Sequence, residues 1–250
     1  MVDENKQVDS VEVADSAGKH NDSRRRWLKK AGMASPALLL LANRPAMAAG
    51  CTISGFMSVN MGTSLTVHEG ATCNGWSPGN WKNDRGQITS AAWNMTGLSP
   101  STPFKTVFDT RSLGGAQIRK VIGGTPENNV VDYQSRINQT FIQELQGNTK
   151  TNSITQHAAA CYLNAMFLQG GGAGSNPDPW MLNYPTADDI IGLYLMYEMS
   201  HMYPQAGVTY QLERGGLLVG RSDNMTVNDY NNFFVSISDG GGSDDWQSGL

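Results

Sequence analysis

Apolar residues in the second half of the chain recur at the spacing of an α-helix. Residues 184–199, YPTADDIIGLYLMYEM, are apolar on nearly every side and offer Thr186 as a cap, with Asp189 three residues later. Residues 153–169, SITQHAAACYLNAMFLQ, instead form one narrow stripe of mostly small side chains, namely Ile154, Ala158, Cys161, Ala165 and Leu168. We therefore predict two helices here, of which the one at 184–199 is buried.

A third helix is predicted upstream, over residues 125–145. Its start signal is Thr125-Pro126-Glu127, a cap followed by Pro at the first helical position. Gly147 follows as a stop signal. The residues at helical spacing between these two signals are Val130, Gln134, Ile137, Phe141 and Leu145.

Strand-like alternation is confined to two stretches. Residues 52–67 alternate loosely, which indicates one or two short strands. In residues 207–221, GVTYQLERGGLLVGR, alternating apolar residues precede Gly215-Gly216, which predicts a hairpin. The predicted fold class is therefore mainly α: a compact helical domain with small β-hairpins near the start and the end of the mature chain.

The beginning of the chain resembles a bacterial export signal. Residues 23–29, SRRRWLK, are similar to the twin-arginine motif S-R-R-x-F-L-K through Ser23, Arg24, Arg25, Trp27, Leu28 and Lys29. An apolar run of about a dozen residues follows, too short to span a bilayer. The small residues Ala46 and Ala48 then suit a signal peptidase. We predict a twin-arginine signal peptide with a polar extension over residues 1–48, and a periplasmic or extracellular mature protein.

An alternative interpretation concerns the residues around the cleavage site. Ala48-Ala49-Gly50-Cys51 resembles a lipobox, although the usual Leu is Ala48 here. Acylation of Cys51 would anchor the mature protein in the envelope by a lipid. Contact with a membrane is accordingly expected only through the export signal or through this lipid.

The mature chain keeps three cysteines in a compartment that permits disulfides. A bridge between Cys51 and Cys73 would close a loop of about 23 residues and is the predicted pairing. Cys161 lies in an apolar helical pattern and is expected to be a small buried hydrophobe. If Cys51 carries a lipid, Cys73 and Cys161 are the remaining pair.

Charge excludes one class of partner. The chain has 18 Lys plus Arg and 22 Asp plus Glu, and residues 1–48 hold eight of the basic and six of the acidic ones. The mature chain thus has ten basic and sixteen acidic residues and a net charge of −6. Without a clustered positive face, nucleic acid is not an expected partner. We predict one globular domain over residues 49–238 and a flexible acidic Gly/Ser tail over residues 239–250.

The order of several short segments resembles a family of exported bacterial domains marked by S-P-G-Y-W-K-N-H. The matching segments are SPGNWKN (77–83), AAW (91–93), PFKTVF (103–108), FIQELQ (141–146), QHAAACYLNA (156–165) and YPTADDII (184–191). Asn80 replaces the Tyr of the motif, Asp84 replaces its His, and the stretch from Asp109 to Thr140 looks like an insertion. The resemblance implies export and a mostly helical domain, and it names no reaction. The motif positions are Ser77, Pro78, Gly79, Trp81, Lys82, Asn83 and His157.

The motif region also predicts local structure. Ser77-Pro78-Gly79-Asn80 is a tight-turn sequence that fits a type II turn. Trp76 and Trp81 flank it and could stack on sugar rings, but we favour the interpretation that Trp81 packs onto the helices and pins the turn.

Two spacings suggest metal chemistry without completing a site. His157 and Cys161 lie four apart on one helical face, and a third ligand would have to come from Cys73, His68 or His201. Glu198 and His201 form one E-x-x-H, the half-motif of a dinuclear carboxylate centre, and no second copy occurs. We predict neither a metal nor another cofactor.

The functional hypothesis follows from these limits. The chain contains no H-E-x-x-H and no G-x-x-x-x-G-K-[ST]. We favour an exported, noncatalytic envelope or surface protein that binds another envelope protein or a glycan. The alternative is a periplasmic hydrolase or a metal-dependent redox protein exported in the folded state. An enzyme requires titratable side chains that converge in a pocket, whereas the first hypothesis expects His68, His157 and His201 to be scattered.

Overall fold

The computed structural model describes residues 73, 75–82, 90–147, 153–172, 174, 179–182 and 184–238. All of these belong to the structural unit Pro45–Leu250. The export signal, the cleavage site, Cys51, His68, Asn83, the strands predicted at 52–67 and the tail at 239–250 lie outside the described residues, so they stay predictions.

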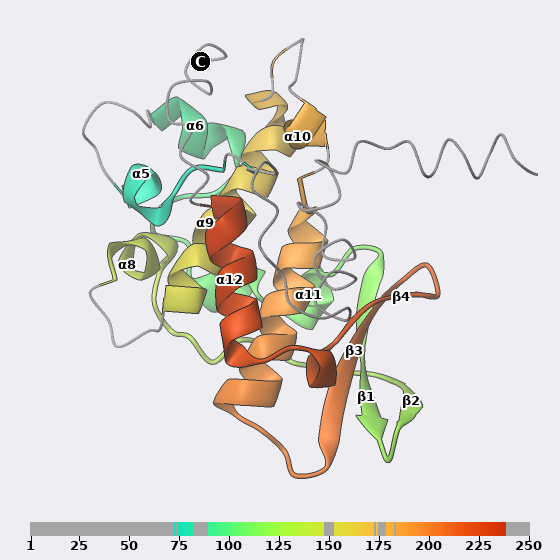
Figure 1. Cartoon of the computed structure of the whole chain (residues 1–250). Helices are drawn as coiled ribbons and strands as arrows, with labels where there is room; N and C mark the ends of the chain where they lie inside the picture. The colour runs from blue at the N-terminus through green and yellow to red at the C-terminus, as the bar shows by residue number, and fades with distance from the viewer. Residues whose placement is uncertain are drawn as a thin grey trace, which may run out of the picture. The chain divides into compact units, whose positions relative to one another are not determined.

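Three helices lie together at the centre of this unit. Helix α9 (Ser153–Phe167) packs against both α11 (Ala187–Tyr197) and α12 (Val227–Ser238), as Figure 1 shows. The two helices predicted for residues 153–169 and 184–199 are confirmed. Helix α9 is buried on nearly every side rather than along one stripe, because helices cover it from several directions.

Helix α11 begins at the predicted capping box. The Asp189 backbone N–H donates to Thr186 Oγ1 at 3.3 Å, and the Thr186 backbone N–H donates to Asp189 Oδ2 at 3.3 Å. Its core-facing residues are buried, as predicted, and the helix continues into the π-helical turn η3 (Glu198–Met202). Helix α9 likewise continues into a π-helical turn, η2 (Leu168–Gly172).

A four-stranded antiparallel sheet packs beside α11 (Figure 1). Its order is β2-β1-β3-β4, with β1 (Ala116–Ile122), β2 (Thr125–Val130), β3 (Val208–Arg214) and β4 (Leu217–Arg221). Leu212 of β3 faces the helix at Gly192, where an added Cβ would meet Leu212 Cδ1 at 2.6 Å. Glycine therefore allows the close approach of α11 and the sheet.

The mainly-α prediction is wrong, because about half of the described residues are helical (53%) and a fifth (20%) are extended, most of them in the four-stranded sheet. Residues 125–130 are strand β2 rather than the start of a helix. Gly123 and Gly124 have φ values of 58° and 82°, as a tight two-residue hairpin turn requires. Strand β1 also pairs along its whole length with β3, so distant strand pairing overrides the local helix signal at Thr125. The hairpin predicted at 207–221 is confirmed as β3 and β4, joined to β1 in one sheet.

The predicted type II turn is also wrong. Residues Pro78–Lys82 form the short helix α5, with Pro78 at its first position. Ser77 caps this helix, since the Asn80 backbone N–H donates to the carbonyl oxygen of Ser77 at 3.0 Å and lies 3.3 Å from its Oγ. Pro presets the first helical position as readily as a turn position, and the capping serine decides between them.

Short helices complete the described part of the unit. They are α6 (Ser90–Met95), α7 (Phe104–Val107), η1 (Thr110–Ser112), α8 (Phe141–Gln146), α10 (Pro179–Leu182) and η4 (Ser222–Asn224). Gly147 ends α8 in the left-handed conformation, as predicted for that stop signal. No helix among the described residues combines the length and the apolar character needed to cross a bilayer.

Candidate functional site

The tryptophans of the motif region lie inside the protein. Trp76 and Trp81 are each 2% exposed, and their rings meet edge to face with centroids 5.2 Å apart. Trp93 of α6 and Phe167 of α9 extend this aromatic cluster. Trp81 packs onto the helices, as predicted, but the segment that it fixes is helix α5 rather than a turn. Neither ring offers a face for stacking on a sugar.

Asn164, a fully buried residue of α9, holds the motif segment by hydrogen bonds. Its Oδ1 accepts from Trp81 Nε1 at 2.8 Å and from the Trp76 backbone N–H at 3.2 Å. Its Nδ2 donates to the Trp76 carbonyl oxygen at 3.0 Å and to the Tyr184 hydroxyl at 3.2 Å. The Tyr184 hydroxyl in turn donates to the carbonyl oxygen of Ile237 in α12 at 3.1 Å. One amide thus ties together four segments that lie far apart in the sequence.

Close packing explains why residue 75, beside this network, is a glycine. A Cβ added at Gly75 would lie 2.2 Å from the Ile237 carbonyl oxygen and 2.6 Å from Asn164 Nδ2. The described residues of the S-P-G-x-W-K-N segment and of QHAAACYLNA therefore build the scaffold. Sequence reasoning missed Asn164, although a polar amide within an apolar helical pattern was a usable signal.

His157 and Cys161 both contact α12 and do not form a shared site. His157 Nδ1 lies 2.7 Å from Ser238 Oγ, and the Cys161 thiol donates to the Phe234 carbonyl oxygen at 3.3 Å. Within the described part of the chain, no group of three His, Cys, Asp or Glu side chains could hold a metal ion.

The cysteine predictions are tested in part. Cys161 is fully buried, as predicted, and keeps its thiol, so it does not bridge to Cys73. Since Cys51 lies outside the described residues, the Cys51–Cys73 bridge stays a prediction.

A buried carboxyl group lies at the start of the π-helical turn η3. Glu198 is 0% exposed, and its Oε1 accepts a hydrogen bond of 2.7 Å from the Arg136 backbone N–H. The Tyr133 hydroxyl lies close to this carboxyl, yet among the described residues neither it nor Glu198 Oε2 has a partner at regular hydrogen-bond geometry. Burial raises the pKa of Glu198, although the hydrogen bond from the Arg136 backbone N–H and the nearby polar groups of Ser135 and Tyr133 oppose this increase.

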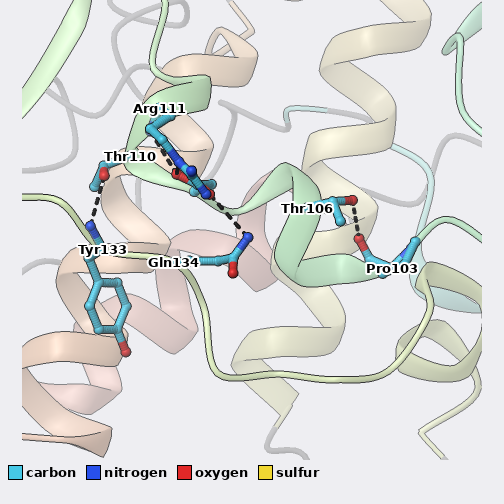
Figure 2. Close-up of polar contacts among 7 residues, drawn as sticks. Pro103, Thr106, Thr110, Arg111, Tyr133 and Gln134 are labelled. Carbon is cyan, nitrogen blue, oxygen red and sulfur yellow. Dashed lines mark hydrogen bonds and ion pairs between the residues drawn. The ribbon is translucent and has the colours of Figure 1, made fainter.

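Glu198 thereby holds one side of the segment 133–136 in place. Figure 2 shows the contacts that hold the other side of this segment. The Tyr133 backbone N–H donates to Thr110 Oγ1 at 2.9 Å, and Gln134 Nε2 donates to a carboxylate oxygen of Asp109 at 3.1 Å. The Arg111 guanidinium holds the pKa of the Asp109 carboxyl below its ordinary value. Asp109 and Glu198 are therefore structural anchors of this segment.

His201 lies in the same turn as Glu198 but contacts other groups. Its Nε2 is 3.1 Å from the Met225 carbonyl oxygen, and its ring lies beside Tyr197 and Tyr230, with centroids 5.9 and 5.4 Å away. The E-x-x-H spacing therefore does not bring the two side chains to a common ligand.

The raised pKa of Glu198 predicts a pH-dependent stability. The folded protein holds this proton to a higher pH than the unfolded chain, so the stabilisation is complete below the unfolded-state pKa and is lost as pH rises through the folded-state pKa. Because glutamine stays neutral, Glu198→Gln should gain stability relative to the wild type as pH rises from about 4 to about 8. Urea unfolding across this range measures the effect.

The matched control for this experiment is Glu127→Gln, in the exposed strand β2. It should follow the wild-type pH profile. Superimposable profiles for the wild type and Glu198→Gln would show that Glu198 keeps an ordinary pKa in the folded protein.

A half-open pocket of about 200 Å³ lies where α9 ends beside α10. Its lining is mostly apolar: Ala165, Leu168, Gln169, Met181, Leu182, Tyr184, Pro185 and Thr186. Leu182 at its rim is 72% exposed. The lining contains no acid, histidine, cysteine, lysine or arginine, and the Tyr184 hydroxyl is already bonded to Ile237. The pocket can therefore hold an apolar group but offers no acid–base pair or activated nucleophile.

Neither of the two described histidines, His157 and His201, lines this pocket. The resemblance to the exported domains of the S-P-G-Y-W-K-N-H motif stays a prediction. No protein-family model, no curated protein and no solved structure matches the chain.

Proposed function

We propose that this chain is an exported, noncatalytic binding domain, which receives an apolar side chain of another envelope protein in the pocket at Leu182. The observation that carries the proposal is the lining of this pocket, which is apolar and lacks convergent titratable groups. Export rests on the twin-arginine signal and the cleavage site of the leader sequence.

The size and chemistry of the pocket favour a protein side chain over a glycan. Its volume of about 200 Å³ is below the roughly 300–1,000 Å³ of pockets that enclose a drug-sized ligand. Sugar recognition commonly uses an exposed aromatic face, and Trp76 and Trp81 are buried. A leucine, methionine or similar side chain is the group that suits this lining.

The hydrolase and redox alternatives lack support in the described part of the chain. Glu198 is closed off from solvent, and His201 and His157 contact different neighbours. An acid or base that acts on a substrate must lie within hydrogen-bond reach of it.

Photo-crosslinking in the producing cells tests the proposal. A benzophenone amino acid at Gln169, an exposed residue of the pocket lining, should yield an adduct with an envelope protein. Leu182→Asp should reduce the adduct at least about tenfold, because the carboxylate disfavours an apolar guest. The control position is Asn232, an exposed residue of α12. Absence of an adduct from position 169, or equal adducts from 169 and 232, would refute the proposal.

A further inference from the structure

Arg214 links the pocket to a second exposed apolar residue, Leu217. Thr186, which lines the pocket, accepts a hydrogen bond of 2.7 Å from Arg214 Nη2. Arg214 lies at the end of β3, directly opposite Leu217 of β4 in the strand ladder. Directly opposed residues lie on the same face of a sheet with Cβ atoms about 5 Å apart. Leu217, which is 74% exposed, therefore lies next to Arg214 on the face that borders the pocket.

The surface between the two apolar positions carries an excess of negative charge. Arg214 forms an ion pair of 2.9 Å with Asp189 and a weak one of 4.0 Å with Asp188. One guanidinium thus faces two carboxylates. Asp188 is 31% exposed at its side chain and accepts a long hydrogen bond of 3.4 Å from the Gly115 backbone N–H. This carboxylate is the group best placed to accept a further cation.

We propose that the pocket, Asp188 and Leu217 form one continuous docking surface for an extended segment of a partner protein, with a lysine or arginine between two apolar side chains. This inference rests on the proposed function and specifies which side chains the partner protein contributes. One apolar side chain enters the pocket at Leu182, the basic side chain pairs with Asp188, and the second apolar side chain covers Leu217. The net charge of −6 of the mature chain favours the approach of such a basic segment.

The arrangement of the elements in Figure 1 agrees with this surface. The end of β3 contacts the start of α11 through Arg214, and Figure 1 shows the connection between β3 and β4 at the upper end of the sheet, the end nearer to α10. Ile122 is also exposed (48%) but lies at the opposite end of β1 and β3, where it pairs with Val208. It therefore provides a matched control outside the docking surface.

The test uses the benzophenone amino acid at position 217 and, separately, at position 169 of the full chain in the producing cells. Both positions should capture the same protein, and mass spectrometry of the crosslinked peptide should find a lysine or arginine between apolar residues. Asp188→Asn should reduce the adduct from position 169 at least about fivefold, while Ile122→Asp should leave it unchanged. The melting temperature of each variant is measured alongside, and neither substitution is expected to change it by more than about 2 °C.

The outcomes separate the two proposals. An adduct from position 169 without one from 217, or an adduct insensitive to Asp188→Asn, would overturn the extended surface and leave the pocket proposal standing. An adduct from position 217 alone would refute the pocket and with it this inference. Absence of both would overturn both proposals.

Discussion

Replacing Asn164 by alanine is expected to lower the free energy of unfolding by about 3–5 kcal/mol. The substitution removes the acceptor of the Trp81 indole N–H and of the Trp76 backbone N–H, and both groups stay buried. Each buried donor that loses its partner costs about 1–3 kcal/mol, and the loss of the two bonds from Nδ2 adds to this. Urea unfolding of the mature domain measures the difference.

Asn232→Ala is the matched control for this substitution. Asn232 is an exposed residue of α12, so its replacement should change stability by no more than about 0.5 kcal/mol. A loss of less than about 1 kcal/mol for Asn164→Ala would contradict the structural role of the amide network.

Replacing Trp81 by alanine should cost a similar amount, about 3–5 kcal/mol, which is the range for deleting a buried large aromatic side chain. Trp81 is 2% exposed and packs edge to face on Trp76 and Trp93. Trp81→Phe keeps an aromatic ring but loses the 2.8 Å bond to Asn164, so it should cost less than alanine.

A double-mutant cycle tests whether the two residues act as one unit. Because Trp81 and Asn164 share a hydrogen bond, the combined alanine variant should lose less stability than the sum of the single losses. Strictly additive losses would show that the two side chains stabilise the fold independently. In that case the network described around Asn164 would be wrong.

Elements defined by local signals could be predicted from the sequence. The capping box of Thr186 and Asp189 and the continuous apolar pattern after it identified α11 and its burial. The glycine pair at 215–216 identified the hairpin of β3 and β4. In each case, neighbouring residues contain the information that fixes the structure.

Strands β1 and β2 were not recognised. Thr125-Pro126-Glu127 has the composition of a helix start, while β1 is stabilised by β3, which lies about 90 residues later in the chain. The glycine pair at 123–124 was the better local signal, and it predicts a hairpin. Helix α12 also had a usable signal, because Thr226 and Asp229 form a capping box ahead of apolar residues at helical spacing.

The candidate site was predictable only in part. The packing role of Trp81 followed from its residue type and its position beside a short polar segment. The pocket is assembled from the end of α9, from α10 and from residues 184–186, so no single stretch of sequence reveals it. The adjacency of Leu217 to this pocket depends on Arg214, whose partners Thr186 and Asp189 lie about 25 residues earlier, at the start of α11.

The central claim is that the segment around Trp81 belongs to the scaffold, whereas the pocket at Leu182 binds the partner. The most direct test measures two quantities in each of two variants. These are the adduct yield from the crosslinker at position 169 and the melting temperature. Trp81→Phe should lower the melting temperature but keep the wild-type yield below that temperature, because the pocket stays intact. Leu182→Asp should keep the melting temperature, since Leu182 is 72% exposed, and lose the adduct. The claim would be contradicted if Trp81→Phe kept its melting temperature but lost the adduct, while Leu182→Asp gave the full adduct yield. That result would show that the motif is the binding site.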